Sequence, residues 1–479
     1  MSIVTAITTN NIKVIKSVLV CGLIYLSGCE TLSETPYVKP TTPDKAGWIA
    51  DSADAATDAI DPQWWKGFED PYLNQLIELA IRENSDLAIA MARLNQAGAA
   101  IGEVEARTLP SLSSGLTTPV SYSRNPVSND YETNSQYSLN TKLNWELDIW
   151  GKLQKGVEAK QSAYRASQAD WRAVYLNTAT QVASSYFLIR QFDAQIDIQQ
   201  ASLSSADQIL AIYKSQNREG LVSSKEVLRQ QAELNSLKRT LIDLQRERKI
   251  TENALATLLG QPAGNLQVPK PDDSFKIADM PIPAGLPSQL LRRRPDILAA
   301  EYRVLEAHQL VGQAKLAKLP SISLTTNAQS GSSLASAALN TFLKTFTFGL
   351  TPNINFPIFN PDTEARIKRN EASKKTEEAK YRKTVLIAFQ EVEDALVNLS
   401  ARRAQRQELF SEEQHLSDVQ LQVAAQMREG IATQLEVFES ERRLLSVRQT
   451  LLNNRQQILS ETLTLYKAMG GGWNEESVQ

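Results

Sequence analysis

An internal duplication constrains the fold of this chain more than any other feature. The motif Arg218-Glu219-Gly220-Leu221 returns 210 positions later as Arg428-Glu429-Gly430-Ile431. The same offset relates further residues of the two halves: Gly102 and Gly312, Leu109-Pro110-Ser111 and Leu319-Pro320-Ser321, Val182 and Val392, and Gly260 and Gly470. Matches at one fixed spacing indicate two copies of one structural unit. We therefore expect residues 29–280 and 281–479 to form two repeats.

Each repeat contains one very long stretch that favours a helix. The first runs from Gly151 to Arg218 without a proline, and the second runs from Asn360-Pro361 to about Arg428. Asparagine as N-cap with proline at the first helical position is a favourable helix start. Apolar residues recur at every seventh position of two segments: Tyr175, Val182, Ile189, Ile196, Leu203 and Leu210, and Val437, Leu444, Leu451, Ile458 and Leu465. Sustained heptads predict long coiled-coil helices.

A reversal of the chain is predicted after each Arg-Glu-Gly motif. Shorter helices are expected at about 223–259 and 433–469, so that each repeat forms a helical hairpin. Glycine is favoured just after the last helical residue, because the chain often turns there with a positive φ. Gly220 and Gly430 are therefore expected to make the two reversals.

Two segments have the alternation of strands with one apolar and one polar face. One runs from Tyr137 to Ile149, with Leu139, Leu143 and Trp145 on its apolar face, and the other runs from Phe346 to Ile358. Each is at least as long as the roughly 9–11 residues with which a strand crosses a bilayer. Their partners are expected near 111–122 and 322–330, with polar turns at 124–134 and 331–344. A single soluble hairpin would explain one of these patterns, but two at matched positions favour a membrane.

Four strands cannot close a membrane barrel alone. No segment after Cys29 has the about 18 consecutive apolar residues of a transmembrane helix, so any crossing must use strands. Open strand edges are not tolerated in lipid, and the smallest membrane barrels have about eight strands. Several chains are therefore expected to contribute to one barrel, whose polar inner face suits a water-filled pore.

The N-terminus has the pattern of a targeting signal. Lys13 and Lys16 precede a short apolar run, which ends at Leu26-Ser27-Gly28-Cys29. Small residues before a cysteine resemble a bacterial lipobox, in which the thiol is acylated and the peptide is cut before the cysteine. Residues 1–28 are thus predicted to be a lipoprotein signal peptide, and Cys29 to carry the lipid. An ordinary signal peptide with an incidental cysteine is the alternative.

Composition argues against several other classes of protein. The chain has 51 Lys and Arg, 54 Asp and Glu and a net charge of −3, without the basic block of a nucleic-acid arm. Its only histidines, His308 and His415, are far apart in sequence. No phosphate-binding loop, nucleophile elbow or Cys/His metal spacing is present. We therefore expect no catalytic residue, no metal and no cofactor beyond the lipid on Cys29.

The chain resembles the TolC-type outer membrane factor family, in particular the lipoprotein branch that serves resistance-nodulation-division (RND) efflux pumps. The resemblance rests on residues that span nearly the whole mature chain: the lipobox at Cys29, Leu290-Leu291-Arg292-Arg293-Arg294-Pro295-Asp296-Ile297, Gly312-Gln313-Ala314 with Leu319-Pro320-Ser321-Ile322, Phe389-Gln390-Glu391-Val392, and the two Arg-Glu-Gly motifs. It implies an α+β membrane protein that forms a homotrimer. Each chain would supply four strands to a 12-stranded outer-membrane β-barrel, continued by a long antiparallel coiled-coil tunnel in the periplasm.

The resemblance also implies a function and partners. The chain would be the exit channel of a tripartite efflux pump, lipid-anchored in the outer membrane and joined to a periplasmic adaptor and an inner-membrane RND transporter. An equatorial belt would come from 260–287, the segment after Cys29 and the residues after Gly470. A duct for type I protein secretion and a non-channel coiled-coil envelope lipoprotein are the alternatives.

The two reversals are the predicted gate and adaptor-docking site. If the long helices run from the barrel toward the inner membrane, both turns lie at the periplasmic tip. Gly220 and Gly430 would allow the tight reversal, and charged pairs would hold neighbouring helices shut: Arg218, Glu219, Arg428 and Glu429. Helix capping and surface solvation would explain the same charges. Family channels often carry an acidic residue two places after the second glycine, where this chain has Ala432, so a carboxylate ring is not expected there.

Overall fold

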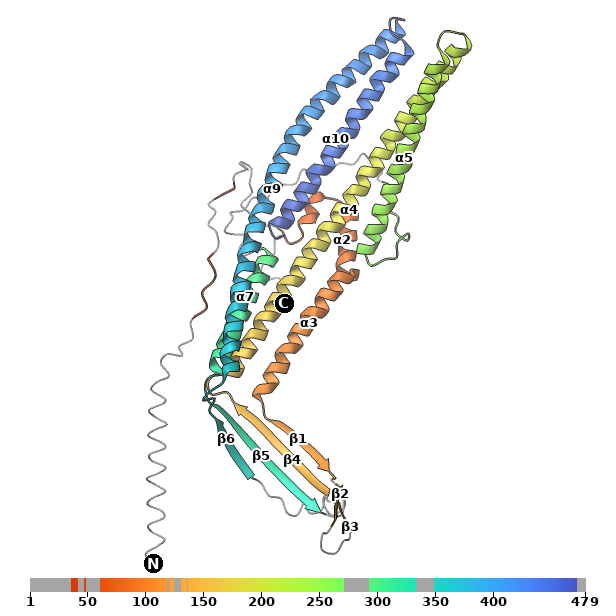
Figure 1. The fold of residues 1–479 in the computed structure, drawn as a ribbon. Coiled ribbons are helices and arrows are strands. Elements are labelled where there is room, and N and C mark those ends of the chain that lie inside the picture. Colours follow the sequence, from red (N-terminus) through yellow and green to blue (C-terminus); the bar gives the residue numbers. More distant parts are fainter. Residues whose placement is uncertain are drawn as a thin grey trace, which may run out of the picture.

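The computed structural model describes residues 36–41, 47–48, 61–118, 120–124, 131–135, 137–270, 293–332 and 349–471. The predicted signal peptide and Cys29 lie outside these residues, and so do Phe346, most of the turn at 331–344 and the predicted repeat boundary at 280/281. The molecule is elongated, with a β-sheet at one end and the tips of two helical hairpins at the other (Figure 1).

Both repeats share the order helix, β-hairpin, long helix and shorter helix, and the first has further short elements. The first contains η2 (Trp64–Phe68), α2 (Pro71–Glu83), α3 (Ser85–Glu105), η3 (Ala106–Thr108), β1 (Ser111–Thr117), β2 (Val120–Arg124), β3 (Tyr131–Ser135), β4 (Tyr137–Leu147), α4 (Lys152–Arg218) and α5 (Ser224–Leu258). The second contains α7 (Pro295–Leu316), β5 (Ser321–Ser332), β6 (Gly349–Asn355), α9 (Pro361–Arg428) and α10 (Gln434–Ala468).

The predicted long helices are confirmed. The helices α4 and α9 have 67 and 68 residues, and the return helices α5 and α10 have 35 each. The helix α9 starts as expected, with Pro361 in its first turn and the Asn360 side chain accepting a hydrogen bond from the Thr363 amide. The heptad residues Val182 and Ile189 are completely buried, which explains their spacing along α4.

A four-stranded antiparallel sheet joins the two repeats. Its strand order is β1-β4-β5-β6, so each repeat supplies one hairpin and the strands β4 and β5 form the seam between them. In that seam Trp145 lies opposite Leu324, and Leu143 lies opposite Thr326. Residues that face each other across antiparallel strands point to the same side of the sheet. The apolar residues of β4 and β5 therefore form one continuous face.

The first predicted polar turn contains more structure than expected. Within and before 124–134, the strands β2 and β3 form a separate antiparallel pair, with Tyr122 opposite Thr133 and Arg124 opposite Tyr131. A simple turn was the wrong prediction for this segment. Tyrosine, valine and threonine favour extended backbone, and together they extend the β1–β4 hairpin beyond the four-stranded sheet.

The main hydrophobic core lies midway along the helices, where shorter segments pack around them. Trp64 stacks on Tyr466 at 5.3 Å between ring centroids, and Phe68 meets Phe187 edge-on at 4.9 Å. The segments around η2 and α2 and residues 261–270 contribute to this core. This is the position expected for the equatorial belt; residues 271–287 and 472–479 of the predicted belt lie outside the description.

Candidate functional site

Both Arg-Glu-Gly motifs end a long helix in the same backbone conformation. Gly220 and Gly430 each have a φ of 73°. The Leu221 amide donates to the Gln216 carbonyl at 2.9 Å, and the Ile431 amide donates to the Gln426 carbonyl at 2.8 Å. The Gly220 amide also donates to the Asn217 carbonyl at 3.1 Å and the Gly430 amide to the Met427 carbonyl at 3.0 Å, so these are Schellman motifs, which satisfy the last helical carbonyls. The predicted chain reversal at both glycines is confirmed, and both turns lie at the end of the molecule opposite the sheet (Figure 1).

The charges of the two turns point into solvent. Arg218, Glu219, Arg428 and Glu429 are all exposed, and none forms an ion pair with another described residue of the chain. The predicted gate pairs are thus not made within one chain, and they require a neighbouring chain. Helix capping is the alternative explanation for these charges. The described caps of both helices are made by backbone groups, and the four charged side chains take no part in them.

Sequence reasoning missed the apolar residue that follows each glycine. Leu221 is 75 % exposed and Ile431 is 77 % exposed, so the tip of each hairpin presents one aliphatic side chain. In a Schellman motif this residue commonly packs back on the helix, which neither does here. The sequence signal that could have identified these two residues is their occurrence at matched positions in both repeats.

Polar contacts join the two hairpins near the tip. Arg442 of α10 pairs with Glu233 of α5 at 3.4 Å, and the Ser205 hydroxyl of α4 donates to Glu441 of α10 at 2.9 Å. Farther from the tip, Gln195 of α4 donates to Asn453 at 2.6 Å. A groove of 230 Å³ lies among these helices, with Phe438 in its wall. These polar contacts, together with the buried Phe438 side chain, hold the hairpins together over their distal part.

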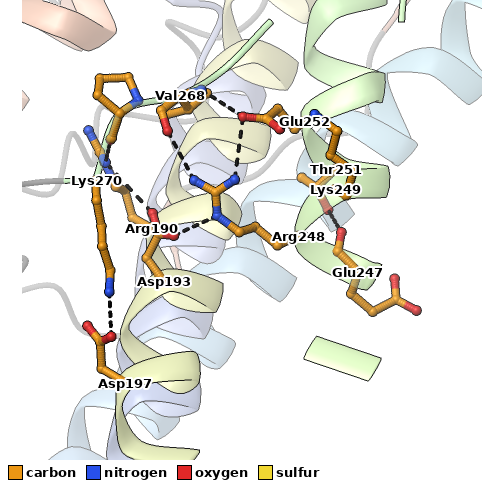
Figure 2. Close-up of polar contacts among 11 residues, drawn as sticks. Arg190, Asp193, Asp197, Glu247, Arg248, Lys249, Thr251, Glu252, Val268 and Lys270 are labelled. Carbon is orange, nitrogen blue, oxygen red and sulfur yellow. Dashed lines mark hydrogen bonds and ion pairs between the residues drawn. The ribbon is translucent and has the colours of Figure 1, made fainter. Parts of the chain in front are cut away.

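A network of buried charges fastens residues 266–270 to the first hairpin (Figure 2). Arg248 of α5 donates to Asp193 of α4 at 2.6 Å, to Glu252 at 3.4 Å and to the Val268 carbonyl at 3.0 Å. The Val268 amide donates to Glu252 at 2.7 Å. Asp193 is only 5 % exposed and Glu252 only 2 % exposed. We call Arg248, Asp193, Glu252 and Val268 the belt clamp.

The charge balance of the belt clamp explains why carboxylates are stable there. Burial disfavours the ionised form of Glu252, but hydrogen bonds from Lys249 and the Val268 amide, together with the Arg248 charge, outweigh it and lower its pKa. A lowered pKa in the folded state contributes stability above the ordinary glutamate range, and this contribution is lost as the pH falls through the folded pKa. Arg190 adds a second cation, 3.8 Å from Asp193.

The Arg-Arg-Pro-Asp-Ile segment fixes where α7 begins. Arg294 is buried and donates to Asp296, to the Ala468 carbonyl at the end of α10 and to Glu391 of α9, the last at 2.7 Å. Pro295 opens α7, which suits a residue without an amide hydrogen. This motif thus ties three helices together near the belt.

The sheet separates apolar from polar side chains. Leu112 and Leu116 of β1 are 70 % and 62 % exposed, and Leu350 and Ile354 of β6 are each 53 % exposed, all on the apolar face. Serine, threonine and asparagine dominate the opposite face. In the described part of the four strands, the charged residues of the polar face are Lys142 and Glu146, and Glu146 is paired with Lys152 at 2.5 Å. Lys142 makes no ion pair with any described residue.

The described ranges offer neither a metal-binding cluster nor a membrane-spanning helix. These ranges contain no group of three or more His, Cys, Asp or Glu side chains that could hold a metal ion. His308 is buried against Tyr37, with 5.6 Å between the ring centroids, and His415 is exposed. In the same ranges no helix has the length and apolarity needed to cross a bilayer.

Comparison with known proteins decides the class of this fold. The model of a family described as outer membrane efflux protein matches residues 76–261 and 286–471. This chain belongs to the outer membrane efflux protein family. The pyoverdine export outer membrane protein OpmQ of Pseudomonas putida is 31 % identical over 447 residues, which cover 90 % of this chain and 93 % of OpmQ.

A second relative and a solved structure agree. The cation efflux system protein CusC of Escherichia coli is 30 % identical over 464 residues, covering 95 % of this chain and 98 % of CusC. The outer-membrane channel OprN superposes with a TM-score of 0.81 at 27 % identity, covering 92 % of this chain and 99 % of OprN. The two family matches correspond to the two repeats, so the predicted duplication, fold and outer-membrane location are confirmed.

Family membership also decides among the predicted functions. This outer membrane efflux protein is the outer-membrane channel component of an efflux system, as the resemblance implied. A coiled-coil tether without a channel does not fit a family of transport proteins whose matches extend over both repeats and include the strands.

The reversal glycines allow a direct test of backbone strain at the tips. A Cβ atom at Gly220 would meet no atom within 4 Å, so replacement by alanine affects only the backbone. Because a side chain at positive φ costs roughly 1–2 kcal/mol, Gly220→Ala is expected to lower the opening free energy of the turn by that amount. Hydrogen exchange of the Leu221 amide measures it. Gly220→Asn is the matched control and should lose less, since asparagine tolerates this conformation; equal losses would contradict the explanation.

Proposed function

We propose that this protein is the passive exit duct of a tripartite efflux pump and works as a homotrimer. The observation that carries the proposal is the four-stranded sheet with one apolar face and two outer edges, placed at one end of two long helical hairpins (Figure 1). Three copies give a barrel of 12 strands, which removes the open edges that lipid does not tolerate. The helices continue the barrel into the periplasm as a tunnel.

Planar bilayers test the duct. Purified protein should be a trimer in mild detergent and should produce discrete conductance steps without nucleotide or metal. A monomer by light scattering, or a trimer that conducts no ions even when Arg218 and Arg428 are reversed to glutamate, would contradict the proposal. The chain performs no covalent chemistry, so the energy for export comes from an inner-membrane RND transporter, to which a periplasmic adaptor connects the tunnel.

The cargo is proposed to be small organic molecules. Relatives of nearly equal similarity are named for pyoverdine export and for cation efflux, so the channel itself discriminates little among cargoes. Copper or silver export commonly uses methionine ligands, and this chain has five methionines, none clustered. Deleting the gene should sensitise cells to dyes, detergents or antibiotics and leave copper and silver tolerance unchanged. Loss of a secreted protein instead would favour type I secretion, the second candidate.

A lipid anchor on Cys29 is part of the proposal. Two or more acyl chains suffice for stable attachment to a membrane, and the lipobox places them at the N-terminus of the mature chain. Cells fed radioactive palmitate should label the wild-type protein, and Cys29→Ala should abolish the label. The variant is expected to remain in the outer membrane, because the barrel also holds it there. A wild-type chain without label would disprove the anchor.

We further propose that the tip charges close the resting channel between neighbouring chains. Arg218 and Arg428 would pair with Glu219 and Glu429 across helix pairs, and adaptor binding would replace these pairs and favour the open state. Reversing both arginines to glutamate is expected to raise the resting conductance and the antibiotic leakage several-fold. Replacing both with lysine keeps the charge and serves as the control. Unchanged conductance in an assembled trimer would assign the arginines to helix capping or adaptor contact.

A further inference from the structure

The two outer strands of the sheet indicate how copies of the chain join. Within one chain the seam between repeats is made by β4 of the first and β5 of the second. The strands β1 and β6 are the outer strands of the described four-stranded sheet. In the duplication β6 is the counterpart of β4, and β1 is the counterpart of β5. A second copy of the chain can therefore continue the sheet by repeating the seam that already exists.

The register of the two β-hairpins shows which residues of the first repeat correspond to which residues of the second. Ser111 begins β1 and Ser321 begins β5, 210 positions apart. In the hairpins, however, Ser111 lies opposite Asn144, and Ser321 lies opposite Asn355. The counterpart of Asn144 is thus Asn355, 211 positions away. The β6 strand is displaced by one residue relative to the general repeat offset, and the apolar alternation agrees, because Leu143, Trp145 and Leu147 correspond to Ile354, Phe356 and Ile358, 211 positions later.

We propose that β6 of one copy pairs antiparallel with β1 of the next in one defined register. It follows by transferring the β4–β5 pairs Asn144 with Thr325, Leu143 with Thr326, and Lys142 with Asn327 to their counterparts. The resulting intersubunit pairs are Asn355 with Gly115, Ile354 with Leu116, and Asn353 with Thr117. This inference rests on the proposed homotrimer and specifies its membrane interface.

The facial pattern of the two strands supports this register independently. Ile354 and Leu116, both more than half exposed in the single chain, come together on the apolar face. Gly115 and Asn355 come together on the polar face. A slip of one residue would place Ile354 opposite a polar-face residue, because successive side chains of a strand point to opposite sides. Only slips by two residues remain as competitors.

The packing of the helices next to the sheet also supports an interface that repeats the internal seam. The helix α7 packs against both α4 and α9, whereas its counterpart α3 packs against α4. Ala299 of α7 is fully buried, but its counterpart Ile89 of α3 is 49 % exposed. An exposed isoleucine at this position is explained if α9 of the neighbouring copy covers α3, as α4 covers α7 within the chain.

One close contact between α4 and α7 within the chain corresponds to a pair of oppositely charged residues at the proposed interface. Gly156 of α4 lies against Gln313 of α7, whose amide nitrogen is 2.5 Å from where a Cβ atom would stand. The counterparts are Arg366 of α9 and Glu103 of α3, which carry opposite charges. Each is half or more exposed in the single chain. Within the single chain Arg366 pairs with Asp362 and Glu103 pairs with Arg107, each at the surface of its own helix, and across the interface Arg366 and Glu103 meet as opposite charges.

Not every internal ion pair has an ion pair as its counterpart at the interface between copies. The internal pair of Arg303 with Asp170 has Arg93 and Lys380 as counterparts. Lys380 is already paired with Glu377 of its own helix at 2.8 Å, so Arg93 does not meet an uncompensated cation. The interface is therefore defined by the strands and by Arg366 with Glu103.

Cysteine cross-linking tests the register sharply. The sequence has two cysteines, Cys21 and Cys29, so a Cys21→Ser, Cys29→Ala background contains no other thiol. Directly opposed residues have Cα atoms about 4.5–5.5 Å apart and can form a disulfide, whereas a two-residue slip moves them beyond the reach of about 7 Å. Gly115→Cys with Asn355→Cys should give covalent dimers and trimers under mild oxidation. A Cβ atom at Gly115 meets nothing within 4 Å.

Off-register and internal pairs provide the controls. Asn355→Cys combined with Ser113→Cys or with Thr117→Cys should cross-link at least ten-fold less. Asn144→Cys with Thr325→Cys, the internal counterpart, should cross-link within one chain and confirm that the sheet has formed. A trimer that cross-links best through Ser113 or Thr117, or through none of the three pairs, would overturn the register. A monomer with an intact internal cross-link would remove the trimer of the proposed function as well.

A charge swap examines the helical part separately. Glu103→Arg should weaken the trimer, measured as a lower dissociation temperature in detergent, because it places two cations together. Adding Arg366→Glu should restore most of the loss, while Glu103→Arg with Arg369→Glu should not. Lack of restoration in the swapped pair would remove Arg366 from the interface.

Discussion

Replacing Arg248 with methionine is expected to lower the free energy that holds residues 266–270 on the first hairpin by about 3–5 kcal/mol. Removing one partner of a buried ion pair leaves the other charge uncompensated, which is the source of such a cost. Here Asp193 and Glu252 lose their shared cation, while Arg190 and Lys249 remain beside them, so the loss is expected at the lower end of this range (Figure 2). Methionine preserves much of the side-chain length, so the loss reports on charge and hydrogen bonding. Native-state hydrogen exchange of the Val268 amide, which donates to Glu252, measures the change.

Arg246 offers a matched control two positions away on the same helix. It is 54 % exposed and pairs with Glu247 at the surface, where ion pairs contribute about 0–1 kcal/mol. Arg246→Met should therefore change the exchange of Val268 by less than about 1 kcal/mol. Similar losses in the two variants would show that the belt clamp is not the source of the stability.

Reversing the charge of Lys142 should invert the ion preference of the open channel. Lys142 lies on the polar face of β4, opposite Ser113 and Asn327, and the polar face of a membrane barrel lines its lumen. A trimer then carries a ring of three ammonium groups, and over a Debye length of about 8–10 Å these charges attract anions and repel cations. The neighbouring Glu146 is compensated by Lys152 and does not cancel the ring.

The measurement is the reversal potential of single channels in a salt gradient. Wild-type channels with this ring should favour anions more than Lys142→Gln channels do, and Lys142→Glu should favour cations several-fold. Lys142→Arg keeps the charge and should behave as wild type. If the four channels share one reversal potential, the ring does not control permeation and selectivity lies in another part of the duct.

Local patterns predicted most of the elements and the two turns. Heptads and the absence of proline gave the long helices within one residue of their ends, because helix formation depends on neighbours three and four positions apart. Alternation predicted the strands β4 and β6 for the same reason of local geometry. The β2–β3 pair was missed, since its polar composition matches a turn as well as it matches a strand.

Contacts between distant residues were not predictable in the same way. The belt clamp joins Asp193, Arg248 and Val268, and the tip contact joins Glu233 with Arg442. Each of these charges looks like a solvated surface residue in the sequence, because its neighbours along the helix are also charged. Only packing of the segments against one another shows which charges are buried and paired.

By itself, the sequence determined that this protein is a duplicated unit of strands and long helical hairpins, with reversals at Gly220 and Gly430. Periodicity and the backbone freedom of glycine act over a few residues, so they can be recognised in the linear chain. Only the tertiary structure decided that β4 and β5 form the seam between repeats and which residues lie opposite one another across it. The physical reason is that strand register depends on which faces of distant strands are buried together, and local preferences do not determine that.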